Sequence, residues 1–87
     1  MSEGSGVRAV VEVIARALTD QPDEVHVTES QHTSTTLVEL YVAPGDLGKV
    51  IGKQGRTAAA LRTLASTAGE REGKTVTLEI RDTPYRG

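Results

Sequence analysis

Cysteine is missing from this 87-residue sequence, which excludes a disulfide framework and thiolate metal sites. No apolar run approaches the ~20 residues that span a bilayer. The first residues, MSEGSG, lack the basic and apolar regions of a signal peptide. We therefore expect one small cytoplasmic domain with no membrane segment. Its core must be thin, because a chain of this size buries only about 60% of its unfolded surface.

Aromatic residues are nearly absent: the chain has two tyrosines, no phenylalanine and no tryptophan. This argues against the aromatic stacking platform on which RRM and OB-type sheets hold bases. The net charge of −2 also mildly disfavours nucleic acid. Residues 46–62 nevertheless set four basic residues against the single acid Asp46: Lys49, Lys53, Arg56 and Arg62. Such a basic island can attract phosphate locally, although charge alone favours an ordinary solvated helix face about two to one.

Apolar spacing predicts a first helix over about residues 7–19. The residues that share its face are Val7, Val10, Val11, Ile14 and Leu18. The helix should end before Gln21, because a residue that precedes proline is biased away from helical geometry. Two strands are predicted next, over about 24–30 and 35–42, with a polar hairpin loop at 30–34. In the second strand one face carries Val38, Leu40 and Val42.

The second half of the chain predicts two helices and a strand. Asp46 is a favourable N-cap for a short helix over about 47–51. A longer helix should begin near Arg56 after the interruption at 52–55, and Gly69 is its expected C-cap. Its inward residues are predicted to be Leu61, Leu64, Ala65 and Ala68. The alternation over residues 75–81 predicts the last strand.

The predicted order is α-β-β-α-α-β, with no internal repeat and no linker. A three-stranded sheet with one apolar face needs a cover, and three amphipathic helices can supply it on that face. We expect a single two-layer α+β domain over residues 7–82. Residues 1–6 should form a disordered tail and residues 83–87 a loose one.

Two G-x-x-G segments compete as the candidate site, Gly45–Gly48 and Gly52–Gly55. With nine glycines, this spacing should arise about once by chance. The first segment contains Asp46, which would repel phosphate. The second contains Lys53 and Gln54 and stands just ahead of a helix N-terminus, where unpaired amides and the helix dipole favour an anion. Its glycines permit positive φ and close approach of a ligand backbone. A plain connection between two helices, in which the glycines serve only the turn, is about equally favoured.

Other chemistries fit poorly. A phosphate-binding NTPase loop is excluded because the G-to-GK gap is one residue short and Gln54 stands where a Mg²⁺-binding hydroxyl is needed. His26 and His32 are isolated, and surface histidines are favoured over ligands or proton carriers about nine to one. We therefore predict no metal, no cofactor and no enzymatic activity.

Residues 42–65, VAPGDLGKVIGKQGRTAAALRTLA, resemble the signature of KH domains. The shared features are the aliphatic pair Val50-Ile51, the Gly52–Gly55 loop and a following helix that carries Leu61. The helix ahead of the first strand and the single strand after the last helix are similar to the type II, bacterial arrangement. The whole chain resembles the small KhpA-type RNA-binding proteins.

The resemblance implies that the loop clamps the backbone of about four single-stranded nucleotides, through Gly52, Lys53, Gln54 and Gly55. It also implies phosphate contacts from Arg56, Lys49 and Arg62. An apolar floor under the bases would come from Ile51, the short helix and the strand that carries Leu40. Apolar residues at helical spacing belong to a core more often than to a binding groove, about three to one, which argues against this floor.

The resemblance further implies single-stranded RNA and a KH-containing protein as partners. The chain would form a homodimer or a heterocomplex with a KhpB (Jag/EloR)-type protein, and would act as an RNA chaperone linked to cell elongation and envelope homeostasis. The negative net charge and scarce aromatics keep a second function open. In that alternative the chain is a dimerisation module, and its partner supplies most of the RNA contact.

Overall fold

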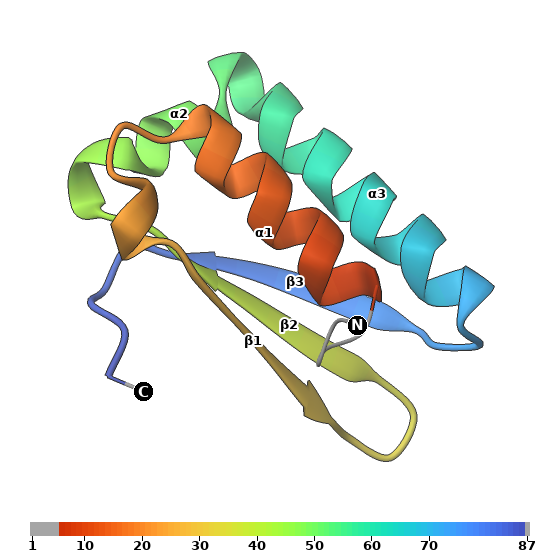
Figure 1. Cartoon of the computed structure of the whole chain (residues 1–87). Helices are drawn as coiled ribbons and strands as arrows, with labels where there is room; N and C mark the ends of the chain where they lie inside the picture. The colour runs from red at the N-terminus through yellow and green to blue at the C-terminus, as the bar shows by residue number, and fades with distance from the viewer. Residues whose placement is uncertain (1–5, 87) are drawn as a thin grey trace.

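The computed structural model describes residues 6–86 and confirms the predicted α+β order (Figure 1). The regular elements are α1 Gly6–Leu18, β1 His26–Gln31, β2 Thr36–Tyr41, α2 Leu47–Ile51, α3 Arg56–Arg71 and β3 Val76–Arg81. Short 3₁₀ turns lie between them: η1 Pro22–Glu24, η2 Pro44–Asp46 and η3 Lys53–Gly55. Within residues 6–86, no helix is long and apolar enough to cross a membrane.

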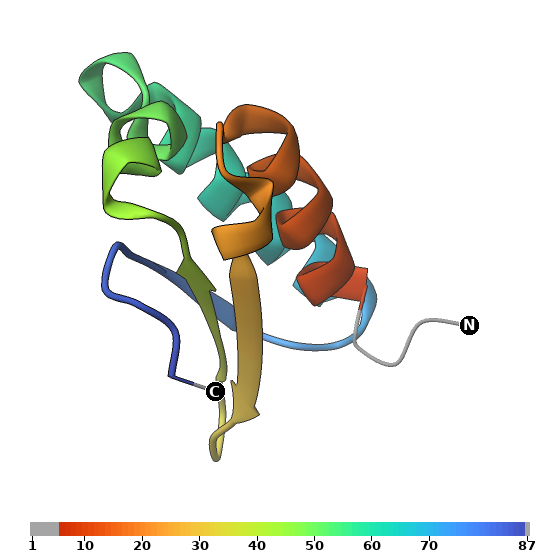
Figure 2. The same ribbon diagram turned by 60° about the vertical axis from the view of Figure 1, so that its left-hand side comes forward.

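The three strands form one mixed sheet in the order β1-β2-β3. β1 pairs with β2 in antiparallel fashion, and β2 pairs with β3 in parallel. The helices lie together on one face of this sheet, with α1 and α3 side by side (Figures 1 and 2). The sheet therefore has one face covered by helices and one face that they leave open.

The core lies between the sheet and the helices. As predicted, Val38 and Leu40 of β2 and Val42 just beyond it turn inward, and each is at most 2% exposed. The helices, β3 and the residue just before β1 add further buried aliphatic residues, namely Val7, Val11, Ala15, Val25, Val50, Leu61, Ala65 and Leu78. The prediction for Leu64 was wrong, because 46% of this residue is exposed.

The sequence predicted Gly69 as the C-cap of α3. This prediction was wrong, because the helix continues to Arg71. The residue is buried where α3 crosses the start of β3. A Cβ atom at Gly69 would lie 2.4 Å from Cγ2 of Val76, so the glycine allows the helix and the strand to approach. The glycine with positive φ beyond the helix is Gly73 (φ 72°).

Asp46 precedes α2, as expected of an N-cap, but its side chain makes no capping hydrogen bond. Its carboxylate is buried and accepts the backbone N–H groups of Asp20 (3.2 Å) and Gln21 (3.0 Å). The acid therefore ties the connection after α1 to the start of α2. These partners lie more than twenty residues away along the chain, beyond the reach of a local capping rule.

The described ends of the chain contact the domain. The amide of Gly6 already belongs to α1 and donates to Oε2 of Glu72 at 2.9 Å, while the rest of the predicted disordered tail lies outside the described residues. Residues 82–86 turn back on the side of the sheet opposite the helices (Figure 2). There the ring of Tyr85 stacks on His26 with centroids 4.6 Å apart, a contact that the expected loose tail did not include.

Candidate nucleic-acid interface

The Gly52–Gly55 loop joins α2 to α3 through a backbone of positive φ angles. The values are 76° at Gly52, 56° at Gln54 and 74° at Gly55. Side chains disfavour this region, and glutamine visits it only where the surroundings impose it. Gly52 also closes α2, since its N–H donates to the carbonyl of Gly48 at 2.8 Å. The loop is therefore a defined turn between two helices.

The two glycines of the loop have different physical roles. A Cβ atom at Gly52 would lie 2.2 Å from Oγ1 of Thr57, so the fold itself excludes any side chain there. A Cβ at Gly55 would meet nothing within 4 Å, so only its φ angle calls for glycine. The surface at Gly55 is open, and another chain can approach its backbone closely. Thr57 is a structural partner of the loop that sequence reasoning missed, because no local pattern marks it.

Three of the predicted basic residues project from this region. Lys53 and Arg56 are exposed beside the turn, and Arg62 is exposed six residues further along α3, about 9 Å along the helix axis. Nη2 of Arg56 donates to Oε1 of Gln54 at 3.1 Å. This hydrogen bond uses the oxygen of Gln54 and leaves its side-chain nitrogen as a donor. The outer surface of the turn therefore presents cations and N–H donors.

The backbone amides contribute less than the sequence suggested. The N–H of Gly55 donates to the carbonyl of Gly52, and that of Arg56 donates to the carbonyl of Lys53. The turn itself therefore uses two of the amides expected to be free at the start of α3. Lys53, Arg56 and Arg62 carry exposed positive charge in this region, and the dipole of α3 adds to it.

Lys49 is placed differently from the other predicted cations. Its Nζ lies 3.2 Å from Oδ2 of Asp20 and 3.8 Å from Oδ1 of Asp46. Two carboxylates therefore already face this ammonium. A phosphate contact by Lys49 would have to compete with both of them.

The predicted apolar floor is only partly present. Leu40 and Val50 are fully buried and Leu61 is 1% exposed, so all three belong to the core. The side chain of Leu40 faces the covering helices and adds no exposed surface to the floor predicted from its strand. Ile51 is half-buried at the end of α2, next to the loop. It is the predicted floor residue that keeps surface available for a base.

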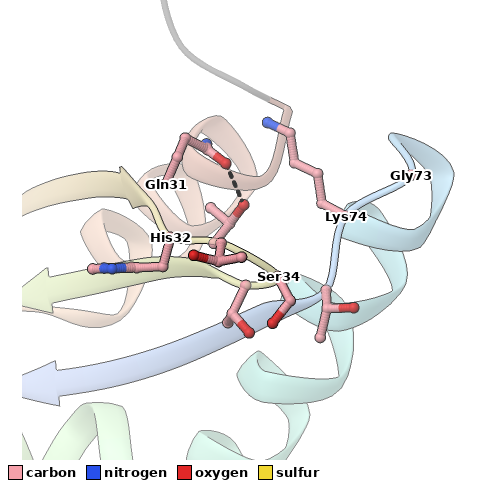
Figure 3. A pocket seen from close by; sticks show the side chains of 9 residues that line it. Gln31, His32, Ser34, Gly73 and Lys74 are labelled. Atoms are coloured by element: carbon pink, nitrogen blue, oxygen red, sulfur yellow. Dashed lines mark hydrogen bonds between the residues drawn. The ribbon is translucent and has the colours of Figure 1, made fainter.

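A polar cavity of about 270 Å³ lies between the β1–β2 turn and the α3–β3 turn (Figure 3). Among its lining residues, Oγ1 of Thr36 donates to Oε1 of Gln31 at 2.8 Å. Nζ of Lys74 lies 3.2 Å from Glu29 and 3.5 Å from Glu72, and the hydrogen bond that it donates to Glu29 raises the pKa of Lys74. This lysine ties β1 to the end of α3. None of the residues of the Gly52–Gly55 loop lines the cavity.

A shallow apolar groove lies on α1 and is lined by Ala9, Val10, Val13 and Ile14. Val13 is 68% exposed. The sequence placed Val10 and Ile14 with the core face. The helix buries Val7, Val11 and Ala15 fully, and Ile14 is half-buried and packs against the core, whereas Val10 is only half-buried. The sequence did not predict the groove, because only part of the apolar face of α1 is buried and the rest stays accessible.

The sequence matches a known domain family over most of its length. The model of the KhpA/KhpB KH domain matches residues 8–80. The chain belongs to the KhpA/KhpB KH-domain family. RNA-binding protein KhpA of Aquifex aeolicus is 50% identical over 76 residues, which cover 87% of this chain and 96% of that protein. RNA-binding protein KhpA of Caldanaerobacter subterraneus subsp. tengcongensis is 52% identical over 71 residues, covering 82% and 95%.

The KH fold also recurs inside a larger protein. The chain superposes on Era in complex with MgGDPNP and nucleotides 1506–1542 of 16S ribosomal RNA with a TM-score of 0.63 and 22% identity. It superposes on a point variant of Aquifex aeolicus Era bound to GDP·AlF4⁻ with a TM-score of 0.64 and 21% identity. The matches cover 86% and 90% of this chain but 29% and 31% of the Era chains. At this identity the likeness concerns the fold alone.

Proposed function

We propose that this chain binds single-stranded RNA through the Gly52–Gly55 loop, which clamps the backbone of about four nucleotides. The observation that carries the proposal is a glycine turn with positive φ at three of its four residues, open at Gly55 and flanked by exposed cations. Two further facts support it. The KhpA relatives are named RNA-binding proteins, and one Era structure of the same fold contains ribosomal RNA nucleotides.

Each residue of the clamp has a distinct role in the proposal. Lys53 supplies a point charge, Gln54 supplies a neutral N–H donor, and Gly55 gives the phosphate room to approach. Arg56 and Arg62 extend the phosphate track along α3, while Ile51 contacts a base edge. Lys49 is an auxiliary contact, because two carboxylates already pair with it.

The decisive experiment replaces both Lys53 and Gln54 with Asp and measures RNA affinity by fluorescence anisotropy. Both side chains are exposed, so the free energy of unfolding should change little while binding is abolished. A matched control makes the same change of charge at the far end of α3, with Thr67→Asp and Arg71→Asp. The control should keep most of the affinity, because exposed charges act over about 8–10 Å at moderate salt. Equal losses in the two variants would show a diffuse charge effect instead of a clamp.

The salt dependence of binding tests the electrostatic part of the proposal. Three or four phosphate contacts on a single strand predict a slope of about −2 to −3 in log K against log[salt]. A wild-type slope near zero would rule out a clamp built on cations.

We further propose that the chain acts as an RNA chaperone with a KhpB-type KH protein and serves cell elongation and envelope homeostasis. The support is the family itself, whose model is shared by KhpA and KhpB. Crosslinking and sequencing of the bound RNA, from cells with and without the KhpB-type protein, test this role. RNA targets that do not change when the partner is deleted would argue against joint action.

A second candidate function is a dimerisation module, favoured by the groove on α1 and by the exposed Leu64 on the neighbouring α3. Light scattering should show a dimer that dissociates in Val13→Asp. A control is Glu12→Gln, on the same helix but outside the groove. If the second function is the main one, the purified chain alone should bind no RNA. If only the clamp matters, Val13→Asp should bind RNA as the wild type does.

A further inference from the structure

The only two tyrosines of the chain meet at a single place. The ring of Tyr85 stacks on His26 with centroids 4.6 Å apart and planes inclined by 22°. The ring of Tyr41 lies 5.3 Å from the Tyr85 ring and is tilted by 58°. We call His26, Tyr41 and Tyr85 the ring cluster. Scarce aromatic residues are therefore concentrated in one site and not dispersed through the core.

The ring cluster lies on the open face of the sheet. His26 pairs with Tyr41 across β1 and β2, and Tyr41 pairs with Arg81 across β2 and β3, so these three residues form one row. Side chains alternate between the faces of a sheet. Because Leu40 is buried towards the helices, the adjacent Tyr41 and its row point to the opposite side. Tyr85 contacts this row through the rings of His26 and Tyr41, and the tail after β3 runs along the same side of the sheet (Figure 2).

The rings are held together but not buried. Tyr85 is 40% exposed, and His26 and Tyr41 are half-buried. A ring that served only to fasten the tail would gain most from complete burial, because the hydrophobic contribution grows with the apolar area removed from water. Here Tyr85 stacks on His26 and still leaves 40% of its surface exposed, so that part of the residue stays available to a ligand.

Cations stand beside this exposed surface. The guanidinium of Arg81 uses Nε in its 2.8 Å hydrogen bond to Oε2 of Glu39, which leaves its terminal nitrogens to face a ligand. Arg86 follows Tyr85 directly and is exposed. The acids nearby are Glu39, already paired with Arg81, the half-buried Asp82 and the exposed Glu79. Planar rings with arginines at their side form the combination that holds single-stranded nucleic acid without reading its sequence.

We infer that the ring cluster stacks an unpaired base of the RNA strand whose backbone the Gly52–Gly55 loop holds, and so forms a second contact on the opposite face. This inference rests on the proposed function. Tyr41 is the last residue of β2, and α2, which carries the loop, begins six residues later at Leu47. The strand therefore reaches the ring cluster by passing around the connection between β2 and α2. Arg81 and Arg86 neutralise the phosphates on either side of the stacked base.

Tyrosine fluorescence reads this site alone, because the chain has no tryptophan and both tyrosines belong to the ring cluster. The probe is an oligouridylate of about 16 nucleotides, the upper range for one single-strand-binding domain. Stacking should cause a saturable loss of tyrosine emission, with the same midpoint as the anisotropy of a labelled strand. Binding seen by anisotropy with unchanged tyrosine emission would overturn the inference and leave the clamp standing. The absence of any binding would overturn both.

Variants at Tyr85 separate stacking from anchoring of the tail. Tyr85→Leu removes the aromatic face and should weaken binding of the 16-mer by about fivefold or more. Tyr85→Phe keeps the ring and should bind as the wild type does. Thermal unfolding of each variant checks that the domain is intact. Equal affinities for Tyr85→Leu and Tyr85→Phe would show that the ring cluster only fastens the tail.

A length series completes the test. A four-nucleotide strand fills the clamp alone, so its affinity should be the same for wild type and Tyr85→Leu. The difference between the two proteins should emerge only as the strand lengthens enough to pass around the edge of the sheet. A loss that is equal for both lengths would contradict a second contact.

Discussion

The segments Gly45–Gly48 and Gly52–Gly55 have the same spacing but different backbones. Gly45 and Gly48 lie in η2 and α2 with ordinary φ angles, and a Cβ at either would meet nothing within 4 Å. Gly52 and Gly55 both have positive φ, and Gly52 has no room for a side chain. The first segment is helical chain in which glycine is optional. The second is a turn that requires glycine.

The difference shows that a short motif gains meaning from its conformation. Each segment also holds one charged residue, and the two residues differ in burial. Asp46 is buried and bonded to two backbone amides, whereas Lys53 is exposed on the turn. The first segment is therefore a structural joint between α1 and α2. The second segment leaves its charge exposed at the surface.

The largest expected effect comes from alanine at one glycine of each segment. Gly52→Ala should lower the free energy of unfolding by about 3 kcal/mol, since positive φ strains an L residue and the new Cβ would overlap Thr57. Gly48→Ala should raise it by about 0.5–1 kcal/mol, as alanine favours a helix. Urea unfolding measures both. Equal effects of the two substitutions would remove the distinction between the segments.

The next effect concerns Asp46, the acid of the first segment. Asp46→Asn should cost about 2 kcal/mol, because the two backbone N–H groups reach different carboxylate oxygens and asparagine replaces one of these oxygens with an NH₂ that would face a donor. Asp20→Asn is the matched control. Its side chain is 76% exposed, so the expected loss is below about 0.5 kcal/mol. A negligible change for Asp46→Asn would mean that the joint does not depend on the charge.

The order of elements was readable from the sequence because it rests on local periodicity. The inward face of β2, the short α2 and the start of α3 at Arg56 were all predicted from neighbouring residues. The errors arose where distant parts of the chain meet. Gly69 is small because β3 packs against it, and Asp46 bonds to amides near residue 20.

The candidate site could likewise be predicted from the sequence only in part. The loop and its cations follow from a contiguous stretch of sequence. The pairing of Lys49 with Asp20 and the burial of Leu40 depend on how the layers stack. The ring cluster was invisible for the same reason, because its residues lie on β1, on β2 and beyond β3. Counting aromatic residues argued against a stacking platform, whereas their positions favour one.

A smaller effect should separate the second glycines of the two segments. Gly55→Ala should cost about 1–2 kcal/mol, because an L residue is strained at φ 74°, but no atom blocks the new Cβ. Gly45→Ala should be near neutral. Gly55→Asn should recover part of the loss, since asparagine tolerates left-handed geometry. Thermal or urea unfolding gives the ranking. An alanine at Gly55 that cost as much as one at Gly52 would show that the turn is closed on both sides.

The smallest effect lies in the salt dependence of RNA binding by two lysine variants. Lys53→Gln should reduce the magnitude of the slope by about 0.7, the loss of one phosphate contact on a single strand. Lys49→Gln should leave the slope unchanged, because its ammonium already faces Asp20 and Asp46. If both slopes changed equally, Lys49 would leave its carboxylates to bind phosphate. The basic surface would then begin in α2, before the Gly52–Gly55 loop.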